Sequence, residues 1–181
     1  MTCQRCLLAR CLCAEIPTVE TRTHVVIVRH HSERFRSSNS GRLAHLALPN
    51  SRLVEHGGPT GTAALPPLDG AWLVFPEGEP TTEWPADRPL PTQLIVLDAT
   101  WSQARKMFRK LGVLRGVPLL RLPEGELPAR LRTAPSPDRV STLEAIARAL
   151  RLVESEAVAA PLETLFAAAV RRAVELGRIG R

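Results

Sequence analysis

The 181-residue sequence lacks long apolar runs and several short motifs that mark common enzyme classes. No apolar run approaches the roughly 18 residues that a transmembrane helix needs, which excludes a membrane span. The P-loop, the G-x-G-x-x-G turn and the G-x-S-x-G elbow are all absent, so ATP-binding, dinucleotide-binding and serine-hydrolase functions have no support. The first residues also lack a basic segment followed by a clean apolar stretch. We therefore expect no signal peptide and a cytoplasmic location.

Lysine is scarce, and the positive charge is unevenly spread. Of the 24 basic residues, 22 are arginines, and the two lysines are Lys106 and Lys110. Residues 1–90 have no net charge, so the net charge of +6 belongs to residues 91–181. Two interpretations stay open. One is a compositional bias of a chain rich in Ala, Leu, Pro and Arg, and the other is a polyanionic partner such as RNA, whose phosphates suit the planar guanidinium.

Cysteine is absent after residue 13. The four cysteines of the chain are Cys3, Cys6, Cys11 and Cys13. Four thiolates so close together can surround one tetrahedral zinc ion, and a site with four protein ligands is structural rather than catalytic. Disulfides are disfavoured in a cytoplasmic chain, whereas an iron–sulfur cluster also takes four thiolates and stays an alternative. We predict a zinc knuckle over residues 1–20, which would carry Arg5 and Arg10 toward nucleic acid or simply cap the core.

The remainder, residues 21–181, has the pattern of one α/β domain. Short apolar runs predict buried strands at 24–28, 71–75, 94–98 and, more weakly, 119–122. Because these runs are continuous rather than alternating, they favour a mostly parallel sheet with helices on both faces.

Helical spacing of apolar residues predicts four helices, over 42–48, 101–111, 141–153 and 161–176. The third opens with Ser141-Thr142-Leu143-Glu144, a capping-box pattern, and the fourth is expected to start at Pro161. Residues 76–92 and 123–138 are rich in proline without periodicity and predict loops.

By its position in the predicted fold, Asp98 is the strongest candidate for a catalytic or ligand-binding residue. It ends a predicted strand, and ligands of open α/β sheets bind beyond the carboxyl ends of strands. Capping of the next helix is the structural alternative for Asp98. That helix carries a basic stripe of Arg105, Lys106, Arg109 and Lys110, which either contacts a polyanion or is a solvated face.

Another candidate loop follows the first strand. It carries His30 and Glu33, and then Asn39-Ser40-Gly41 at the start of the next helix. Backbone N–H groups at such a start can meet carboxylates or phosphates, although an ordinary turn and cap would use the same residues.

Taken in order, these segments resemble the DTW-domain family of tRNA-uridine aminocarboxypropyltransferases. Asp98, Thr100 and Trp101 match its Asp-x-Thr-Trp motif. The other matching segments are the cysteine cluster, His30 to Glu33, Asn39 to Gly41, Leu48 to Asn50, Gln103 to Met107, Leu131 to Arg132 and Ser141 to Ala145. Two positions depart from the family pattern. His31 stands where the family has Pro, which changes the backbone constraint, and Ser40 replaces Thr but keeps the hydroxyl.

The resemblance implies a SPOUT-like α/β fold with a C-terminal trefoil knot. It also implies S-adenosylmethionine as donor and tRNA as partner. We expect a monomer, with an oligomer as the alternative. The reaction would transfer the 3-amino-3-carboxypropyl group to N3 of a uridine and release methylthioadenosine. The zinc of the knuckle would be structural.

The resemblance also suggests roles for residues. Asp98 would be the general base, or would position the amino group of the donor, with Thr100 and Trp101 beside it. Arg130 or Arg132 would hold the donor carboxylate. The other residues expected to bind the donor are Leu97, Asn39, Ser40, Gly41, Leu122, Pro123, Leu131, Ser141 and Thr142. The residues expected to bind RNA are His30, Glu33, Arg105, Lys106, Arg109 and Lys110.

Three alternatives compete with this interpretation. The first is a SPOUT-type RNA methyltransferase, which would release S-adenosylhomocysteine instead. The second is a zinc-knuckle RNA-binding protein without catalysis, in which loss of Asp98 would have no consequence. The third is aminocarboxypropyl transfer to rRNA or another acceptor, because charge alone does not separate tRNA from rRNA.

Overall fold

A five-stranded parallel sheet forms the centre of the protein in the computed structural model, which describes residues 3–36, 39–123 and 141–176. The strands are β1 (His24–His30), β2 (Ser51–His56), β3 (Ala71–Val74), β4 (Gln93–Asp98) and β5 (Leu119–Leu120). Their order across the sheet is β2-β1-β4-β3-β5, and every pairing is parallel. This arrangement confirms the predicted mostly parallel sheet.

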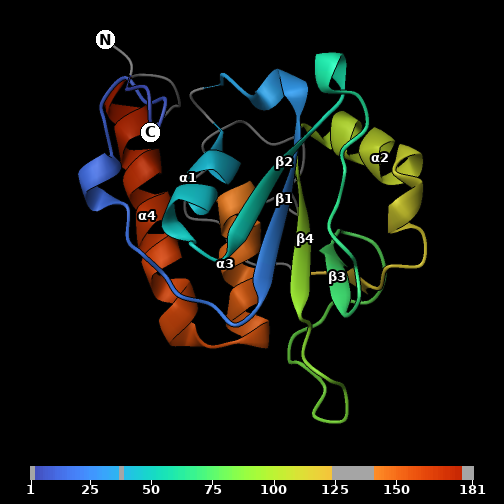
Figure 1. The fold of residues 1–181 in the computed structure, drawn as a ribbon. Coiled ribbons are helices and arrows are strands. Elements are labelled where there is room, and N and C mark those ends of the chain that lie inside the picture. Colours follow the sequence, from blue (N-terminus) through green and yellow to red (C-terminus); the bar gives the residue numbers. More distant parts are fainter. Residues whose placement is uncertain (1–2, 37–38, 124–140, 177–181) are drawn as a thin grey trace.

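Helices cover both faces of the sheet, as the continuous apolar runs predicted (Figure 1). The helices are α1 (Ser40–Ala47), α2 (Trp101–Lys110), α3 (Thr142–Val153) and α4 (Glu156–Glu175). Short 3-10 turns are η1 (Cys13–Glu15), η2 (His31–Glu33), η3 (Gly58–Thr60) and η4 (Gly112–Leu114). Helices α1, α3 and α4 lie on one face, and α2 lies on the other (Figure 1).

Two apolar cores result, one on each face of the sheet. Successive strand residues point to opposite faces, so Val25 and Ile27 join the core under α1, α3 and α4, whereas Val26 and Val28 join the core under α2. Burial on both faces explains why the strand reads as one apolar run.

The start of the chain belongs to the larger core. Cys6, Leu8 and Leu12 are buried together with residues of α3 and α4, and Leu12 is 0% exposed. The predicted cysteine knuckle therefore packs against the α/β core. Its separation from the remainder of the chain as a domain of its own stays a prediction.

Two elements differ from the sequence prediction. Strand β2 was not predicted, because Ser51–His56 contains only two apolar residues and lies at the edge of the sheet with β1 as its one neighbour. Helix α4 begins at Glu156 rather than at Pro161, because the Ser155 side chain accepts a hydrogen bond from the Val158 N–H and caps the helix earlier. Pro161 is accommodated inside α4, two residues after Ala159, which is fully buried in the core.

The trefoil knot also stays a prediction. Residues 124–140, which connect β5 to α3, lie outside the described residues. None of the helices in the described part of the chain is both long and apolar enough to span a bilayer.

Candidate active site

Asp98 lies at the carboxyl end of β4, where the starts of α1 and α3 meet it. Its side chain is almost fully buried, at 3% exposure. Oδ2 accepts a hydrogen bond of 2.5 Å from the Asn39 side-chain amide, and Oδ1 accepts one of 2.7 Å from the Thr142 hydroxyl. Asp98 therefore does not cap α2, which was its structural alternative. It joins the first turns of two other helices.

The start of α1 is shaped to hold this carboxylate. Asn39 caps the helix by accepting a 2.7 Å hydrogen bond from the Arg42 N–H with its side-chain oxygen. That bond turns the amide nitrogen of Asn39 toward Asp98. Gly41 makes the close approach possible, because a Cβ at this position would lie 2.6 Å from Cγ of Asp98.

Ser40 connects the starts of α1 and α3. Its hydroxyl accepts a 3.3 Å hydrogen bond from the buried Leu143 N–H. Ser141 caps α3 by accepting a 3.3 Å bond from the Glu144 N–H, as the capping-box pattern predicted. Six of the predicted site residues thus come together from three distant segments. They are Asn39, Ser40, Gly41, Asp98, Ser141 and Thr142.

Burial, hydrogen bonds and nearby charges together shift the pKa of the Asp98 carboxyl. Burial raises its pKa above the ordinary value of 3.8, and the hydrogen bonds from Asn39 and Thr142 oppose this. The Glu33 carboxylate also raises the pKa, and Arg29 lowers it. A carboxyl held in this way keeps its proton to a higher pH than an exposed aspartate does, which suits a group that takes up a proton during a reaction.

Arg29 is a buried, positively charged residue at the carboxyl ends of the strands. It pairs in register with Asp98 of β4 on one side and with Glu55 of β2 on the other, and it donates to Glu55 Oε1 at 2.6 Å. Arg29 is 5% exposed, so the ion pair is largely removed from water. Three strands therefore present alternating charge at the carboxyl edge of the sheet.

The rest of the Asp-x-Thr-Trp segment is tied to the loop after β1. The Thr100 hydroxyl donates to Gln103 Oε1 at 2.7 Å, and Gln103 Nε2 donates to the Ser32 hydroxyl at 2.9 Å. Ser32 also contacts Nδ1 of His30 at 2.9 Å. Burial, together with the charges of neighbouring histidines, lowers the pKa of His30, so this ring is neutral near pH 7.

The other described residues of the predicted site contact the two cores and α3. The Trp101 ring lies 6.5 Å from that of Phe75, and Leu97 is buried in the core under α2. After β5, Leu122 packs on the larger core, and the Pro123 carbonyl accepts a hydrogen bond from Arg148 of α3. Arg130, Leu131 and Arg132 fall within residues 124–140 and so lie outside the described residues.

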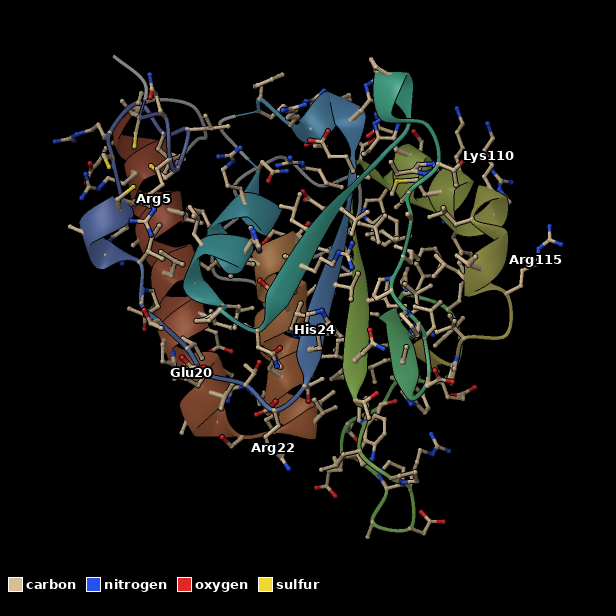
Figure 2. The ribbon with its side chains drawn as sticks, viewed as in Figure 1. Arg5, Glu20, Arg22, His24, Lys110 and Arg115 are labelled. Carbon is tan, nitrogen blue, oxygen red and sulfur yellow. The ribbon has the colours of Figure 1, made fainter. Side chains whose placement is uncertain are left out.

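The predicted basic stripe lies on the solvent side of α2. Arg105, Lys106, Arg109 and Lys110 are all exposed, whereas Ala104 and Met107 face the core. Figure 2 shows Lys110 at the upper right, above the level of His24, the first residue of β1. Burial, and next to it the charge of Lys110, lowers the pKa of His56 at the carboxyl end of β2. The stripe and Asp98 are therefore both near the carboxyl ends of the strands.

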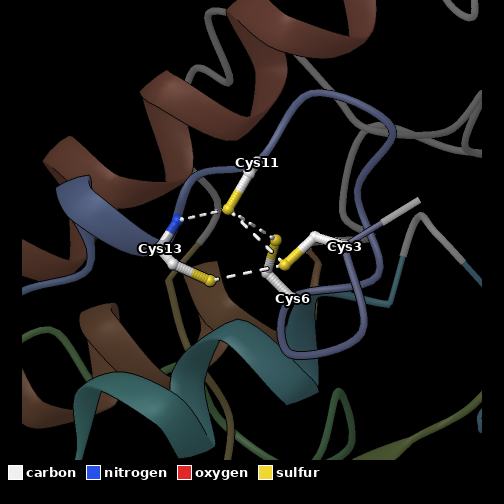
Figure 3. Close-up of side chains that lie close together, drawn as sticks. All are labelled: Cys3, Cys6, Cys11 and Cys13. Atoms are coloured by element: carbon white, nitrogen blue, oxygen red, sulfur yellow. Dashed lines mark hydrogen bonds between the residues drawn. The ribbon is translucent and has the colours of Figure 1, made fainter. Parts of the chain in front are cut away.

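The four cysteine sulfurs point toward one another (Figure 3). All four lie within 4.8 Å, and the Cys3–Cys13, Cys6–Cys11 and Cys3–Cys11 pairs are 3.7, 4.0 and 3.5 Å apart. Four sulfurs around one zinc, each at about 2.3 Å from it, would be ~3.8 Å apart, so the residues fit a single tetrahedral ion. An iron–sulfur cluster, which also takes four thiolates, stays the alternative to zinc.

Local contacts set up the cysteines for binding. Backbone N–H groups of Cys6 and Arg5 lower the pKa of the Cys3 thiol to about 6, whereas burial raises the pKa of Cys13 to about 12. A metal ion binds thiolates and would hold Cys13 in that form. Arg10 donates to Glu175 at 2.6 Å, so this knuckle arginine contacts the end of α4.

Comparison with protein families assigns the chain. The family model of the DTW domain matches residues 1–174, which include the cysteine cluster, the Asp98 centre and all but the last residue of α4. The chain belongs to the DTW domain family.

Named relatives of this DTW protein are distant. A mouse (Mus musculus) protein named tRNA-uridine aminocarboxypropyltransferase 2 is 28% identical over 183 residues, which cover 90% of this chain and 61% of the relative. A protein of the same name from Macaca fascicularis is 28% identical over 184 residues, with the same two shares. The chain thus spans about three fifths of the length of the relatives it matches. No solved structure matches it.

The DTW protein also contains site residues that sequence reasoning missed. Arg29 and Glu55 were not selected. The sequence could have indicated Arg29, because an arginine within the apolar run HVVIVRH is expected to be buried. Glu55 gave none, because β2 itself was not predicted. Arg29 acts on the pKa of Asp98.

Proposed function

We propose that this DTW protein transfers the 3-amino-3-carboxypropyl group of S-adenosylmethionine to N3 of a tRNA uridine. The observation that carries the proposal is the buried Asp98 carboxylate, held between the starts of α1 and α3 within a DTW domain. The names of the distant relatives support the same reaction.

The chemistry needs a positioned donor and a proton acceptor. Uridine N3 loses its proton and forms a bond to the carbon next to the sulfonium. The carbon–sulfur bond breaks, and its electron pair neutralises the sulfur in methylthioadenosine. The sulfonium activates each carbon attached to it, so the site selects the reaction by placing the correct one against N3.

Asp98 is the proposed base for the N3 proton. Among the described residues, each of its oxygens accepts one hydrogen bond, and a carboxylate oxygen has two acceptor positions. The proposed base would accept the N3 proton at a position that these two bonds do not use. The starts of α1 and α3 offer N–H groups to the donor carboxylate, together with Arg130 or Arg132.

The other expected residues surround this centre. The proposed site for the donor includes Leu97, Leu122, Pro123 and Leu131 around the adenosine, with Ser141 and Thr142 near the amino-acid end. The α2 stripe, His30 and Glu33 would contact the tRNA. The uridine must leave its stack to reach a buried carboxylate. The SPOUT-like knotted fold, the monomeric state and the cytoplasmic location belong to this proposal as well.

A structural zinc ion in the cysteine cluster is part of the proposal. It would fix the fold of the first 20 residues against α4 and take no part in the chemistry, because four protein ligands leave it no open position.

Product analysis tests the reaction. The purified protein is incubated with S-adenosylmethionine and unmodified tRNA, and nucleosides and small products are identified by mass spectrometry. Aminocarboxypropyl-uridine with methylthioadenosine is the expected result. A methylated nucleoside with S-adenosylhomocysteine would indicate the methyltransferase instead. Product with rRNA alone would change the acceptor, and no product from either RNA would favour the binding protein.

Replacement of Asp98 tests its role. Asp98→Asn is expected to lower kcat by 10²–10⁴-fold, the usual contribution of a general base, with little change in the KM for the donor. The wild-type rate should rise with pH as Asp98 loses its proton, at a higher pH than for an ordinary aspartate, because burial raises its pKa. A raised donor KM with kcat preserved would assign Asp98 to the donor amino group.

A further inference from the structure

Phe35 is the most exposed of the large apolar side chains in the described ranges. Its exposed fraction is 79%, and the next, Val113, reaches 58%. Phe35 follows η2 directly and precedes the Asn39 cap of α1. A single exposed apolar side chain is common on protein surfaces, so the case for Phe35 depends on the groups around the ring.

The backbone around Phe35 is held by a series of turns. The Arg34 N–H donates to the His31 carbonyl at 3.2 Å, and the Arg36 N–H donates to the Glu33 carbonyl at 3.2 Å. The Asn39 N–H then donates to the Arg36 carbonyl at 3.1 Å. Backbone hydrogen bonds thus hold the residues on both sides of Phe35.

Two half-exposed arginines flank the ring. The side chains of Arg34 and Arg36 are 51% and 49% exposed, and each contacts a much less exposed carboxylate, Glu55 and Glu33 respectively, at 3.4 Å. Those contacts orient the two guanidinium groups. A guanidinium has five N–H donors, so one such contact leaves others for a phosphate.

One face of the ring is already covered. The Arg34 guanidinium lies 5.2 Å from the centroid of the Phe35 ring. A planar group that stacks on the opposite face would complete a three-layer sandwich of cation, phenyl ring and ligand.

The segment that carries Phe35 leads directly to the Asp98 centre. Glu33, two residues before it, is 1% exposed and raises the pKa of Asp98. Asn39, four residues after it, donates its amide to Asp98. Phe35 therefore stands in the chain between two residues that act on Asp98.

We propose that Phe35 is a stacking platform for an unstacked base of the substrate RNA, with Arg34 and Arg36 binding the adjacent phosphates. This inference rests on the proposed function. A single ring between two cations suits a nucleotide, which has an aromatic face and a negative charge. A protein partner would need a wider apolar area than one side chain supplies.

The test compares variants of Phe35 in binding to unmodified tRNA and to a single-stranded oligouridylate. Phe35→Ala and Phe35→Leu should lose about 5- to 150-fold in affinity, the range expected for one base–aromatic stack. Phe35→Trp should bind within about 3-fold of wild type, because it keeps an aromatic face. Leu90→Ala is the matched control, since Leu90 is 44% exposed and precedes β4 at the opposite edge of the sheet.

Salt dependence separates stacking from charge. Phe35→Ala should keep the wild-type slope of affinity against salt, whereas Arg34→Ala and Arg36→Ala should each make it shallower. Affinity of Phe35→Ala equal to wild type would overturn the proposal. So would Phe35→Leu binding as tightly as Phe35→Trp, or Phe35→Ala changing the slope as the arginine variants do.

The two proposals fail differently. If the wild type binds RNA through Phe35 but makes no aminocarboxypropyl-uridine, the proposed function is wrong and the stacking platform stands. If the wild type makes that product and Phe35→Ala has an unchanged KM for tRNA, the stacking platform is wrong. The wild type and Phe35→Ala should bind S-adenosylmethionine with the same affinity. Weaker binding of the donor by Phe35→Ala would place the ring in the donor site and overturn the proposal.

Discussion

At the scale of single residues, Gly41 decides whether α1 can touch Asp98. A Cβ at this position would lie 2.6 Å from both Cγ and Oδ2 of Asp98, closer than nonbonded atoms approach. Alanine favours a helix over glycine by up to about 1 kcal/mol, so propensity alone would stabilise Gly41→Ala. The clash opposes this, since overpacking a close-packed site costs typically about 1–3 kcal/mol.

We therefore expect Gly41→Ala to lower the free energy of unfolding by about 1–2 kcal/mol and to reduce the rate of transfer at least as severely. Denaturant unfolding and the transferase assay measure the two effects. Gly112→Ala is the control, because a Cβ there meets nothing within 4 Å. A Gly41→Ala variant as stable and active as wild type would show that α1 does not need this close approach.

Sequence reasoning at this scale selected Asp98 but did not identify its hydrogen-bond partners. A carboxylate before a helix is most often a cap, yet Thr100 caps α2, and Asp98 binds the starts of α1 and α3 instead. These contacts join residues 59 and 44 positions apart in the chain. No local pattern specifies such contacts. The loop pattern selected Asn39 only as part of a helix start, and the resemblance to a family added Thr142.

At the scale of elements, apolar patterning predicted those elements that are buried. Strands β1, β3 and β4 follow from continuous apolar runs, and α3 follows from its periodicity and its Ser141 cap. Strand β2 lies at the edge and mixes Arg, Glu and His with two apolar residues, so it lacks that pattern. Pro161 misled the prediction for α4 because proline usually starts helices, whereas here the earlier cap at Ser155 and the burial of Ala159 decide.

The segment that carries the four cysteines packs against α4. Removal of one cysteine tests whether a bound metal ion maintains this packing. Cys11→Ser should release about one metal ion per chain, because the remaining three thiolates bind more weakly. Loosening of the first residues would also expose Leu12, which is 0% exposed and whose burial contributes about 1.5–3 kcal/mol. We expect the free energy of unfolding to fall by at least about 2 kcal/mol.

Elemental analysis and thermal unfolding measure both results. Arg10→Ala is the control, because it removes the contact with Glu175 on α4 and leaves the four sulfurs in place. Its metal content should equal that of the wild type. A Cys11→Ser protein with full metal content would contradict a four-cysteine site, and iron with sulfide in place of zinc would assign the cluster alternative.

At the scale of the whole molecule, the two faces of the sheet differ in where they place charged groups. The face under α1, α3 and α4 holds the buried Asp98 centre, and α2 on the other face presents its basic stripe to solvent. Both lie toward the carboxyl ends of the strands, which is where parallel strands bring together residues from distant parts of the chain. A polyanion bound across this edge would contact the stripe while one of its nucleotides reaches Asp98.

Salt dependence of RNA binding distinguishes such a contact from a merely solvated stripe. If Arg105 and Arg109 each neutralise one phosphate, their joint replacement by alanine should make the slope of log affinity against log salt shallower by about 1.4–1.8. Arg52→Ala with Arg171→Ala removes the same charge from β2 and α4, both at exposed positions, and should leave the slope closer to the wild-type value. Equal slopes for the two double variants would mean that only net charge matters. A slope that is shallower for the α2 double variant than for the control would place the phosphate backbone of the RNA along α2, beside the strand ends that hold the Asp98 carboxylate.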